Sequence, residues 1–509
     1  IFSNAEIIKE LNSSKTSLKG RGLLTLLKRR AVRTMSGIAP VAVLTKPYAC
    51  PGECAFCPSE KNVPQSYLSN EPAVMRAIRC KYDPYIQVQD RLRALIANGH
   101  KPEKIELIVI GGTWSVLPIK YKYWYMANCF RAANEFGRQS VGRGGALCPP
   151  IHEARNFSVL QKELIKEQKK NETAKYKIIG ITFETRPDYI SEKELIEMRE
   201  LGCTRVEIGV QAIDDKILKL NKRGHGVQKI VEATALLRNF GFKITYHIMP
   251  GLPGSSPAKD LKMFKQLFSD ERFQPDQIKF YPTVVTRGSL LYKWWRTGKY
   301  KPYSDKNLEN LIIKCKAVVP RYVRIIRLIR DIPAESIEAG NTVTNLRQMM
   351  RNRGVKCECI RCRQQVESQK SKVESRAIAN SKLSIIEYSV VGGKEYFLSY
   401  ESRDGKILYG FCRLRIPDGK EKIKSKEFKF LNNSAMIREL HVYGELVPVG
   451  DKKKVQHSGL GRKLMAEAEK QARANGFKNI VVIAGVGVRE YYRKSGYKSK
   501  RGYMIKEID

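Results

Sequence analysis

The chain has 509 residues, of which 42% are hydrophobic and 28% charged, so it is long enough for two or three globular domains. Lysine and arginine number 93 against 51 acidic residues, and the net charge of +42 indicates an anionic partner, nucleic acid first, with a generally basic proteome as the alternative. No apolar run approaches the roughly 18 residues of a membrane span, which excludes a chain that crosses a membrane as helices.

The cysteine pattern and the N-terminal sequence indicate the cellular compartment of the protein. The 12 cysteines fall into two triplets and six single residues, a pattern typical of metal binding in a reducing cytoplasm rather than of a disulfide framework. No signal peptide is visible, so we expect a cytoplasmic protein without a membrane partner. Because the sequence begins with Ile1 rather than Met, we also expect that an N-terminal piece has been trimmed.

Residues 1–38 form a basic segment. Lys28, Arg29, Arg30 and Arg33 recur there among small and apolar residues, and a leucine-rich stretch indicates a short helix. Lysine point charges and arginine forks contact phosphates. We therefore expect this segment to bind nucleic acid, and a solvated helix face is an equal alternative.

The first cysteine triplet follows a predicted strand at 40–45. It consists of Cys50, Cys54 and Cys57, at the spacing C-x3-C-x2-C. Three such thiolates can hold three irons of a [4Fe–4S] cluster and leave the fourth iron free to bind a substrate. Cleavage of S-adenosylmethionine (SAM) to a carbon radical requires that free iron. A zinc knuckle is the alternative, but zinc prefers a fourth Cys or His at similar spacing, and none follows closely.

Predicted strands and helices alternate from residue 103 on. The strands lie at 104–110, 178–184, 205–211, 243–249 and 277–281, with helices such as 191–201 and 227–240 between them. This alternation predicts a parallel sheet that forms a whole or partial barrel. Ligands of such sheets bind at the carboxyl ends of the strands, where the sequence has Gly111, Gly112, Glu184, Arg186, Gln211 and Lys279. Gly111 and Gly112 permit close backbone approach to a bound methionine moiety, although an ordinary turn is the alternative.

Residues 321–382 contain the second triplet, Cys357, Cys359 and Cys362. Its C-x-C-x2-C spacing fits a structural zinc with a fourth ligand from elsewhere in the chain. A second iron–sulfur cluster and free thiols are the alternatives. The polar, charged stretch from 364 to 382 indicates a linker.

The pattern becomes antiparallel from residue 383, with strands predicted at 395–400, 407–415 and 437–443. The motif Gln456-x-x-Gly459-x-Gly461 then precedes a helix predicted at 463–475, and the N–H groups of such a turn form an anion site. The spacing is that of the pyrophosphate loop in acetyl-CoA-dependent N-acetyltransferases (GNAT). With a strand predicted at 480–483 and Tyr491-Tyr492 after it, we predict a GNAT-type acetyl-CoA fold.

Taken together, these motifs resemble the third Elongator protein family in its archaeal single-protein form. Matching stretches include Glu184-Thr-Arg-Pro-Asp-Tyr189 and Arg438-Glu-Leu-His-Val-Tyr-Gly444, and the match runs from about residue 35 to the C-terminus. The resemblance implies an α/β chain in three parts after the basic segment. These are a partial (β/α) TIM-type radical SAM barrel at 39–320, a linker with a zinc site at 321–382 and a GNAT-type acetyltransferase domain at 383–509.

The resemblance also implies an activity, the carboxymethylation of carbon 5 of the wobble uridine in tRNA. In that scheme a deoxyadenosyl radical takes a hydrogen from the methyl of acetyl-CoA, the acetyl radical adds to uracil, and thioester hydrolysis leaves the acid. The implied partner is the anticodon region of tRNA. A homodimer is left open, and other Elongator-like subunits are unknown or not required.

Site residues follow by carry-over onto matching positions. Cys50, Cys54 and Cys57 hold the cluster. Lys279 is not carried over; it lies at a strand end that faces the cluster, so it is a candidate to contact the sulfonium ligand or uracil, with a surface lysine as the equal alternative. Lys279 and Tyr492 are the candidate catalytic residues. The implied acetyl-CoA contacts are Lys104, Glu439, Leu440, His441, Val442, Gln456, Gly459, Leu460, Gly461, Arg462, Tyr491 and Tyr492.

Two rival functions remain. In the first, the enzyme acetylates protein lysines, as histone acetyltransferases do, and the radical SAM domain is only a scaffold. In the second, the chain is mainly a tRNA-binding module whose enzyme domains gate one another. Twin cofactor motifs argue against a pure binding module.

Overall fold

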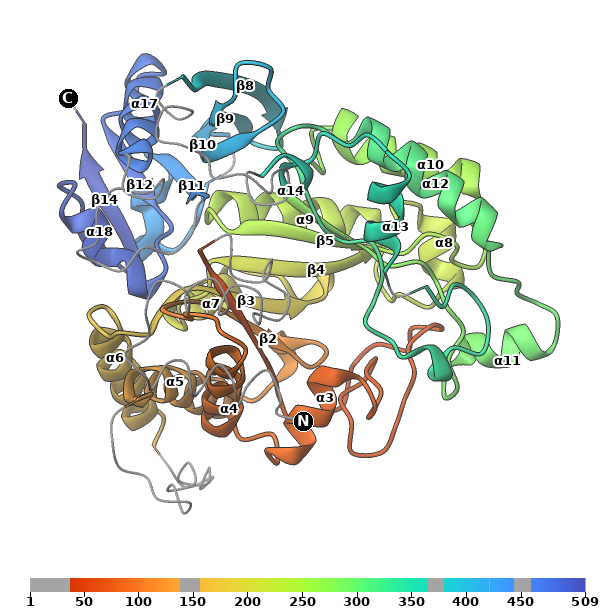
Figure 1. Cartoon of the computed structure of the whole chain (residues 1–509). Coiled ribbons are helices and arrows are strands. Elements are labelled where there is room, and N and C mark those ends of the chain that lie inside the picture. Colours follow the sequence, from red (N-terminus) through yellow and green to blue (C-terminus); the bar gives the residue numbers. More distant parts are fainter. Residues whose placement is uncertain are drawn as a thin grey trace, which may run out of the picture.

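The structure is a computed structural model of the whole chain (Figure 1), and it describes residues 37–137, 156–343, 345–364, 380–420, 422–443 and 459–508. Three predicted features lie wholly or mostly outside the described residues. They are the basic segment up to residue 36, the linker at 365–379 and the Gln456 end of the glycine-rich motif.

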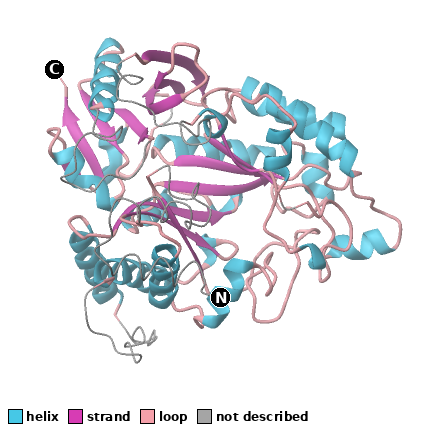
Figure 2. Ribbon diagram, in the orientation of Figure 1, coloured by secondary structure: helices cyan, strands magenta, loops and turns pink. Residues whose placement is uncertain are grey.

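The first domain contains a sheet of seven parallel strands whose spatial order follows the chain order, and the sheet curls into a partial barrel (Figure 2). This confirms the predicted strand–helix alternation and the partial barrel. The strands are β1 (Ala39–Leu44), β2 (Lys104–Ile110), β3 (Lys177–Thr185), β4 (Arg205–Gln211), β5 (Lys243–Ile248), β6 (Gln277–Phe280) and β7 (Arg324–Arg327).

The last of these strands lies beyond the predicted domain boundary. β7 pairs with β6 through Gln277–Arg324 and Ile278–Ile325, so the sheet continues past residue 320 into the segment predicted to be a linker. Ile325 is buried in the core of the first domain. Because Ile325 gains stability from burial, this short stretch forms a strand of the sheet rather than a solvated loop.

Helices cover the convex face of the sheet because one face of each strand is apolar. In β2 the alternate residues Ile105, Leu107 and Val109 are fully buried, while Lys104 and Glu106 lie on the other face. No helix in the described part of the chain is long and apolar enough to cross a membrane. The longer helices are α4 (Pro84–Ala97), α5 (Ile119–Glu135), α6 (Phe157–Asn171), α7 (Glu192–Glu200), α9 (Val227–Asn239), α10 (Pro257–Ser269) and α12 (Asp305–Val318).

The second domain is a separate α/β unit built on a sheet in the order β13-β14-β12-β11-β10-β9-β8. Its first four strands form the predicted antiparallel meander, and β11 then pairs with β12 in parallel. The elements are β8 (Lys382–Val390), β9 (Gly393–Glu401), β10 (Leu408–Pro417), β11 (Ala435–Val442), α17 (Leu460–Ala474), β12 (Asn479–Val482), α18 (Arg489–Arg493), β13 (Lys498–Lys500) and β14 (Tyr503–Glu507).

A buried ionic network joins the two domains. Arg438 of β11 donates to Asp276 of the first domain at 2.6 Å, and Arg238 of α9 donates to Glu395 of β9 at 2.7 Å. All four of these side chains are 0% exposed. The backbones also meet closely, since a Cβ on Gly485 would lie 2.0 Å from the carbonyl oxygen of Ile179. The domains therefore pack as one body with a charged core between them.

Glu439 at this interface gives a prediction for acid stability. Burial alone would raise the pKa of Glu439, but Lys243 and Arg413 override it and lower the pKa from 4.5 to about 2. The ionised carboxylate therefore stabilises the fold above about pH 4.5, and this contribution is lost as the pH falls toward 2. We expect Glu439→Gln to cost on the order of 1–3 kcal/mol of unfolding free energy at neutral pH.

The test is urea unfolding of both proteins across this pH range. Because protonated glutamic acid resembles glutamine, the two unfolding free energies are expected to converge at the acid end. A difference that stays constant with pH would show that Glu439 acts through packing rather than charge.

Candidate active site

The first cysteine triplet lies in the loop after β1. Arg223 Nη1 donates to Cys54 Sγ at 2.9 Å, and Arg186 Nη1 lies 3.8 Å from the same sulfur. The contact with Cys57, together with Arg223 and Arg186, lowers the pKa of Cys54 to about 5 despite burial. Cys54 is therefore a thiolate at neutral pH, which is the form that binds metal. Arg223 is not among the residues predicted for the site, because nothing in its sequence context links it to the cysteines.

The carboxyl ends of β2 and β4 flank this loop. Gly111 has φ +136°, and a Cβ there would lie 2.2 Å from Thr45 Oγ1, so only glycine fits. The backbone of Gln211 also has a positive φ, of 67°. Thr45 Oγ1 and Gln211 Oε1 are buried and have no hydrogen-bond partner in the described part of the chain. Buried polar atoms without partners are costly, so they indicate a polar ligand here.

A cluster of ionisable side chains lies on the concave face of the barrel, below the cysteine loop. Lys279 Nζ lies 3.3 Å from Glu184 Oε1 and also contacts Glu207, and His247 Nε2 lies 2.9 Å from Glu207 Oε2. Tyr67 donates to Glu184 at 2.8 Å. Glu184, Glu207 and His247 are close enough to share a metal ion. Lys279 already contacts both carboxylates, however, and takes the place of such a cation.

Lys279 is a permanent cation. It is 7% exposed, so the alternative of a surface lysine is wrong. Burial would lower the pKa of Lys279, but Glu207, Tyr281 and Glu184 override it and raise the pKa above its usual value. Lys279 can therefore donate hydrogen bonds or stabilise negative charge, but it is a poor proton acceptor.

The ion pairs continue toward the amino ends of the strands. Arg205 Nε lies 3.7 Å from Glu207 Oε1, and Arg205 Nη1 lies 2.7 Å from Glu106 Oε1. Charges of alternating sign thus run from Glu184 through Lys279, Glu207 and Arg205 to Glu106. We call these five residues the ion-pair column. It joins the cysteine end of the barrel to a cavity at the opposite end, which Glu106 lines.

That cavity, of about 530 Å³, is lined by both domains. The first domain contributes the amino ends of its strands, including Lys104 and Lys243, and the second contributes the end of β11, the start of α17 and part of α18. The cavity brings together most of the residues predicted to bind acetyl-CoA, namely Lys104, Glu439, Leu440, His441, Val442, Gly459, Gly461, Arg462, Tyr491 and Tyr492. Leu460 is instead buried in the core, and Gln456 lies outside the described residues.

The start of α17 is shaped by its glycines. The helix begins at Leu460 rather than at Lys463, and Gly459 at its N-cap has φ +79°. A Cβ on Gly461 would lie 2.7 Å from the hydroxyl of Tyr491, so this glycine keeps the first turn open to the cavity. Neighbouring Tyr492 is buried, and burial raises its pKa well above the usual value. Tyr492 therefore keeps its proton and can act only as a hydrogen-bond donor or neutral acceptor.

Comparison with known proteins places this geometry in a family. Residues 45–267 match the model of the radical SAM superfamily, and residues 275–354 match the radical SAM C-terminal domain. The tRNA uridine(34) acetyltransferase of Dehalococcoides mccartyi is 43% identical over 94% of this chain and 100% of that protein. Elongator complex protein 3 of Homo sapiens is 38% identical over 96% of this chain and 87% of that protein.

The chain belongs to the Elongator protein 3 family. A solved structure of Methanocaldococcus infernus Elp3 lacking residues 1–46 matches with a TM-score of 0.75 and 40% identity, over 92% of this chain and 99% of that one. Like its family, the chain is a radical SAM enzyme. The superfamily match implies a [4Fe–4S] cluster and SAM at the carboxyl ends of the strands.

The cysteine loop fits the cluster that the Elongator protein 3 family implies. Cys357, Cys359 and Cys362 have sulfurs within 4.8 Å of one another, whereas Cys50, Cys54 and Cys57 do not form so tight a group. The wider set suits several irons rather than one ion. Arg186 and Arg223 supply positive charge beside a cluster whose thiolates are negative.

The second triplet differs in character. Its tight thiol group suits a single tetrahedral ion. Lys316 Nζ lies 3.8 Å and Arg347 Nη1 4.0 Å from Cys362 Sγ. No fourth Cys, His, Asp or Glu joins this group among the residues that the structure describes. The predicted zinc therefore stays a prediction.

Proposed function

We propose that the protein forms 5-carboxymethyluridine at the wobble position of tRNA, with acetyl-CoA as the source of the added carbons. The observation that carries this proposal is the cavity shared by the two domains. It opens at the amino ends of the barrel strands and is lined by the residues predicted to hold acetyl-CoA. The related proteins named tRNA uridine(34) acetyltransferase support the choice of substrate.

Each end of the barrel has its own task in this proposal. When bound, the cluster and SAM supply a carbon radical. Cys50, Cys54 and Cys57 would hold the cluster, and Thr45, Gly111 and Gln211 would contact SAM. Lys279, held protonated between Glu184 and Glu207, would stabilise negative charge on the uracil carbonyl groups.

The two ends are far apart along the strands. Lys104 begins β2 and Gly111 directly follows its last residue, seven residues further on, which at about 3.3 Å per residue is about 23 Å. The acetyl group must therefore extend along the concave face to meet the radical, and the ion-pair column lies on that path. We further propose that Cys357, Cys359 and Cys362 hold a structural zinc.

Arg462 gives a test of the acetyl-CoA site. It is exposed on the first turn of α17 and lines the cavity, where it can bind a phosphate. We expect Arg462→Gln to weaken acetyl-CoA binding about tenfold, the equivalent of about 1.4 kcal/mol for one charge-assisted hydrogen bond. Calorimetric titration of each protein with acetyl-CoA measures the affinity.

The matched control is Arg473→Gln, since Arg473 is exposed on the last turn of the same helix. This variant is expected to keep wild-type affinity. Equal affinities for all three proteins would place the CoA phosphates elsewhere.

A labelled donor separates the proposal from lysine acetylation. The protein is incubated anaerobically with acetyl-CoA labelled in the acetyl group, SAM and a reductant, together with tRNA and a lysine peptide. We expect label in tRNA that depends on SAM. Label in the peptide, without any need for SAM, would instead support an acetyltransferase with a radical SAM scaffold.

A further inference from the structure

Residues 289–304 project from the first domain beside the cysteine loop. They form α11 (Leu290–Arg296) and the turn that follows it, on the side of the barrel away from the second domain (Figure 1). The sequence is Ser-Leu-Leu-Tyr-Lys-Trp-Trp-Arg-Thr-Gly-Lys-Tyr-Lys-Pro-Tyr-Ser. It has four cations and five aromatic residues but no acid, and the proposed catalytic groups do not include it.

The cations of this segment are free in the described structure. Lys293, Arg296, Lys299 and Lys301 are all exposed, and none forms an ion pair with a described residue. Indeed no acidic residue occurs between Asp276 and Asp305 in the sequence. Four unpaired charges on so short a stretch repel one another, so they indicate an anionic partner.

The aromatic residues of α11 are placed to stack. Tyr292, Trp294 and Trp295 are half-buried, so each ring packs on the core and leaves part of its surface open. The rings of Tyr292 and Trp295 lie 5.8 Å apart at 43°. Half-exposed rings among unpaired cations are the typical platform for single-stranded nucleic acid, since rings stack on bases while cations contact phosphates.

Backbone contacts fix this segment to the cluster loop. Leu291 N donates to the carbonyl oxygen of Ala55, between Cys54 and Cys57, at 2.7 Å. Ser59 N donates to the carbonyl oxygen of Gly288 at 3.3 Å. Gly288 has φ +77°, and a Cβ there would lie 2.7 Å from Ser59 O, so the close approach requires glycine. α11 is therefore held rigidly beside the loop where the radical forms.

We propose that the α11 surface, formed by Tyr292, Lys293, Trp295, Arg296 and Lys299, binds the single-stranded anticodon loop beside the wobble uridine. The inference rests on the proposed function and deepens it by naming where the RNA is held. A membrane surface also attracts basic, aromatic helices. The rigid tie to the cluster loop and the helix length of seven residues favour RNA over insertion into lipid.

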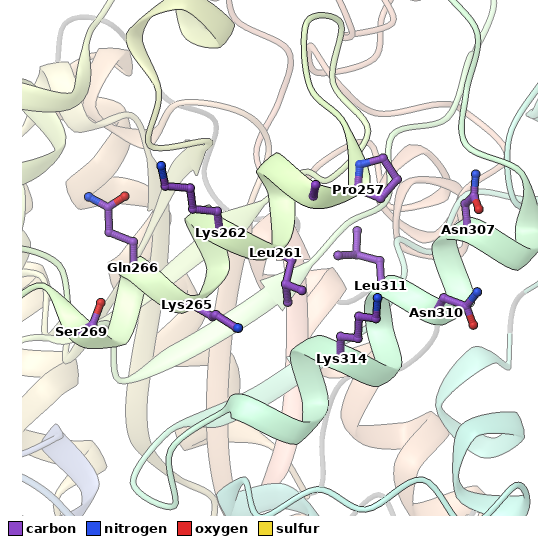
Figure 3. Close-up of a pocket in the computed structure, with 11 residues that line it drawn as sticks. Pro257, Leu261, Lys262, Lys265, Gln266, Ser269, Asn307, Asn310, Leu311 and Lys314 are labelled. Carbon is purple, nitrogen blue, oxygen red and sulfur yellow. The ribbon is translucent and has the colours of Figure 1, made fainter.

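The experiment compares two variants with equal loss of charge. Lys293→Gln/Arg296→Gln removes two cations from α11. The matched control, Lys262→Gln/Lys265→Gln, removes two exposed lysines from the groove of about 780 Å³ between α10 and α12 on the convex face (Figure 3). The wild-type protein and both variants are titrated with an anticodon stem–loop RNA at several salt concentrations.

We expect the α11 variant to bind about tenfold more weakly at physiological salt. Its slope of log affinity against log salt should be smaller by about 1.4, at roughly 0.7 per phosphate contact on single-stranded RNA. The control should keep the wild-type slope and affinity. Equal behaviour of all three proteins, or a loss confined to the control, would overturn the inference.

Intrinsic fluorescence adds a readout of stacking. The chain has four tryptophans, and Trp114 and Trp124 are buried at 3% and 8% exposure, so Trp294 and Trp295 dominate the response to a surface ligand. We expect the stem–loop to quench the wild-type emission. A response to anionic phosphatidylserine vesicles but not to RNA would assign α11 to a membrane and contradict the proposal.

Failure of this inference and failure of the proposed function are distinguishable. If the wild-type protein forms carboxymethyluridine and the α11 variant binds RNA normally, only the α11 assignment is wrong. If the wild-type protein neither binds the stem–loop nor modifies tRNA, the function itself is wrong.

Discussion

The Cys54→Ser protein is expected to lose nearly all formation of carboxymethyluridine and of deoxyadenosine from SAM. Cys54 is the sulfur that Arg223 and Arg186 hold as a thiolate, and a serine hydroxyl at this position stays protonated at neutral pH. Losing one of three thiolates leaves the cluster without a full set of ligands. We expect both products to fall at least a hundredfold, with iron content reduced as well.

A control for the cysteine substitution is Cys80→Ser. Cys80 is buried outside both triplets, and its thiol donates to Asp90 at 3.5 Å, a hydrogen bond that serine can also make. This variant should bind iron and form product as the wild type does. Full turnover by the Cys54→Ser protein would show that the radical chemistry does not depend on this loop.

The second large effect concerns the charged core between the domains. We expect Arg438→Met to destabilise the protein by about 3–5 kcal/mol, because it leaves the buried carboxylates of Asp276 and Glu395 without their shared cation. Arg238 and Arg413 remain beside them and compensate in part. Chemical denaturation, monitored by circular dichroism, measures the loss of unfolding free energy.

A surface pair provides the comparison. Arg501 and Glu427 lie 3.0 Å apart, but both side chains are 54% exposed, so Arg501→Met should change the unfolding free energy by less than about 1 kcal/mol. If Arg438→Met costs as little as Arg501→Met, the interface network does not hold the domains together. Replacing the whole buried network by apolar residues is a different experiment, because such replacements often leave the stability of the protein unchanged.

Much of the fold follows from hydrophobic patterning. The strands of the barrel are continuous apolar runs or alternate strictly, and their predicted bounds differ from the observed ones by at most one residue at either end. β7 falls in the segment predicted as a linker, because its apolar strand period, with arginines between, does not by itself show that it extends the barrel sheet. The predicted start of α17 is three residues late, because Gly459 and Gly461 are poor helix formers, although the open first turn requires them.

The sequence predicts those parts of the site in which the chemistry requires residues at a fixed spacing along the chain. Three thiols at C-x3-C-x2-C and a glycine-rich turn before a helix can be recognised in one dimension. The sequence places Glu184 and Lys279 at the same edge of the sheet, but it does not show that they touch. It also does not show Glu207, which reaches Lys279 from β4, more than 70 residues earlier in the chain. Arg205 and Glu106 could not be paired from the sequence either, because they lie on β4 and β2, with β3 between them in the sheet.

The barrel thus separates its two tasks. Cysteines, arginines and unsatisfied polar atoms occupy the carboxyl ends of the strands, and the cavity shared with the second domain occupies the amino ends. The central claim is that both ends take part in one reaction, with the acetyl group of acetyl-CoA as the hydrogen donor.

The most direct test uses acetyl-CoA with a fully deuterated methyl group. The reconstituted protein is incubated anaerobically with SAM, reductant and tRNA, and deoxyadenosine and the digested tRNA are analysed by mass spectrometry. We predict deoxyadenosine with one deuterium and carboxymethyluridine with two. Deoxyadenosine without deuterium, together with unmodified uridine, would contradict the account and separate the radical site from the acetyl-CoA cavity.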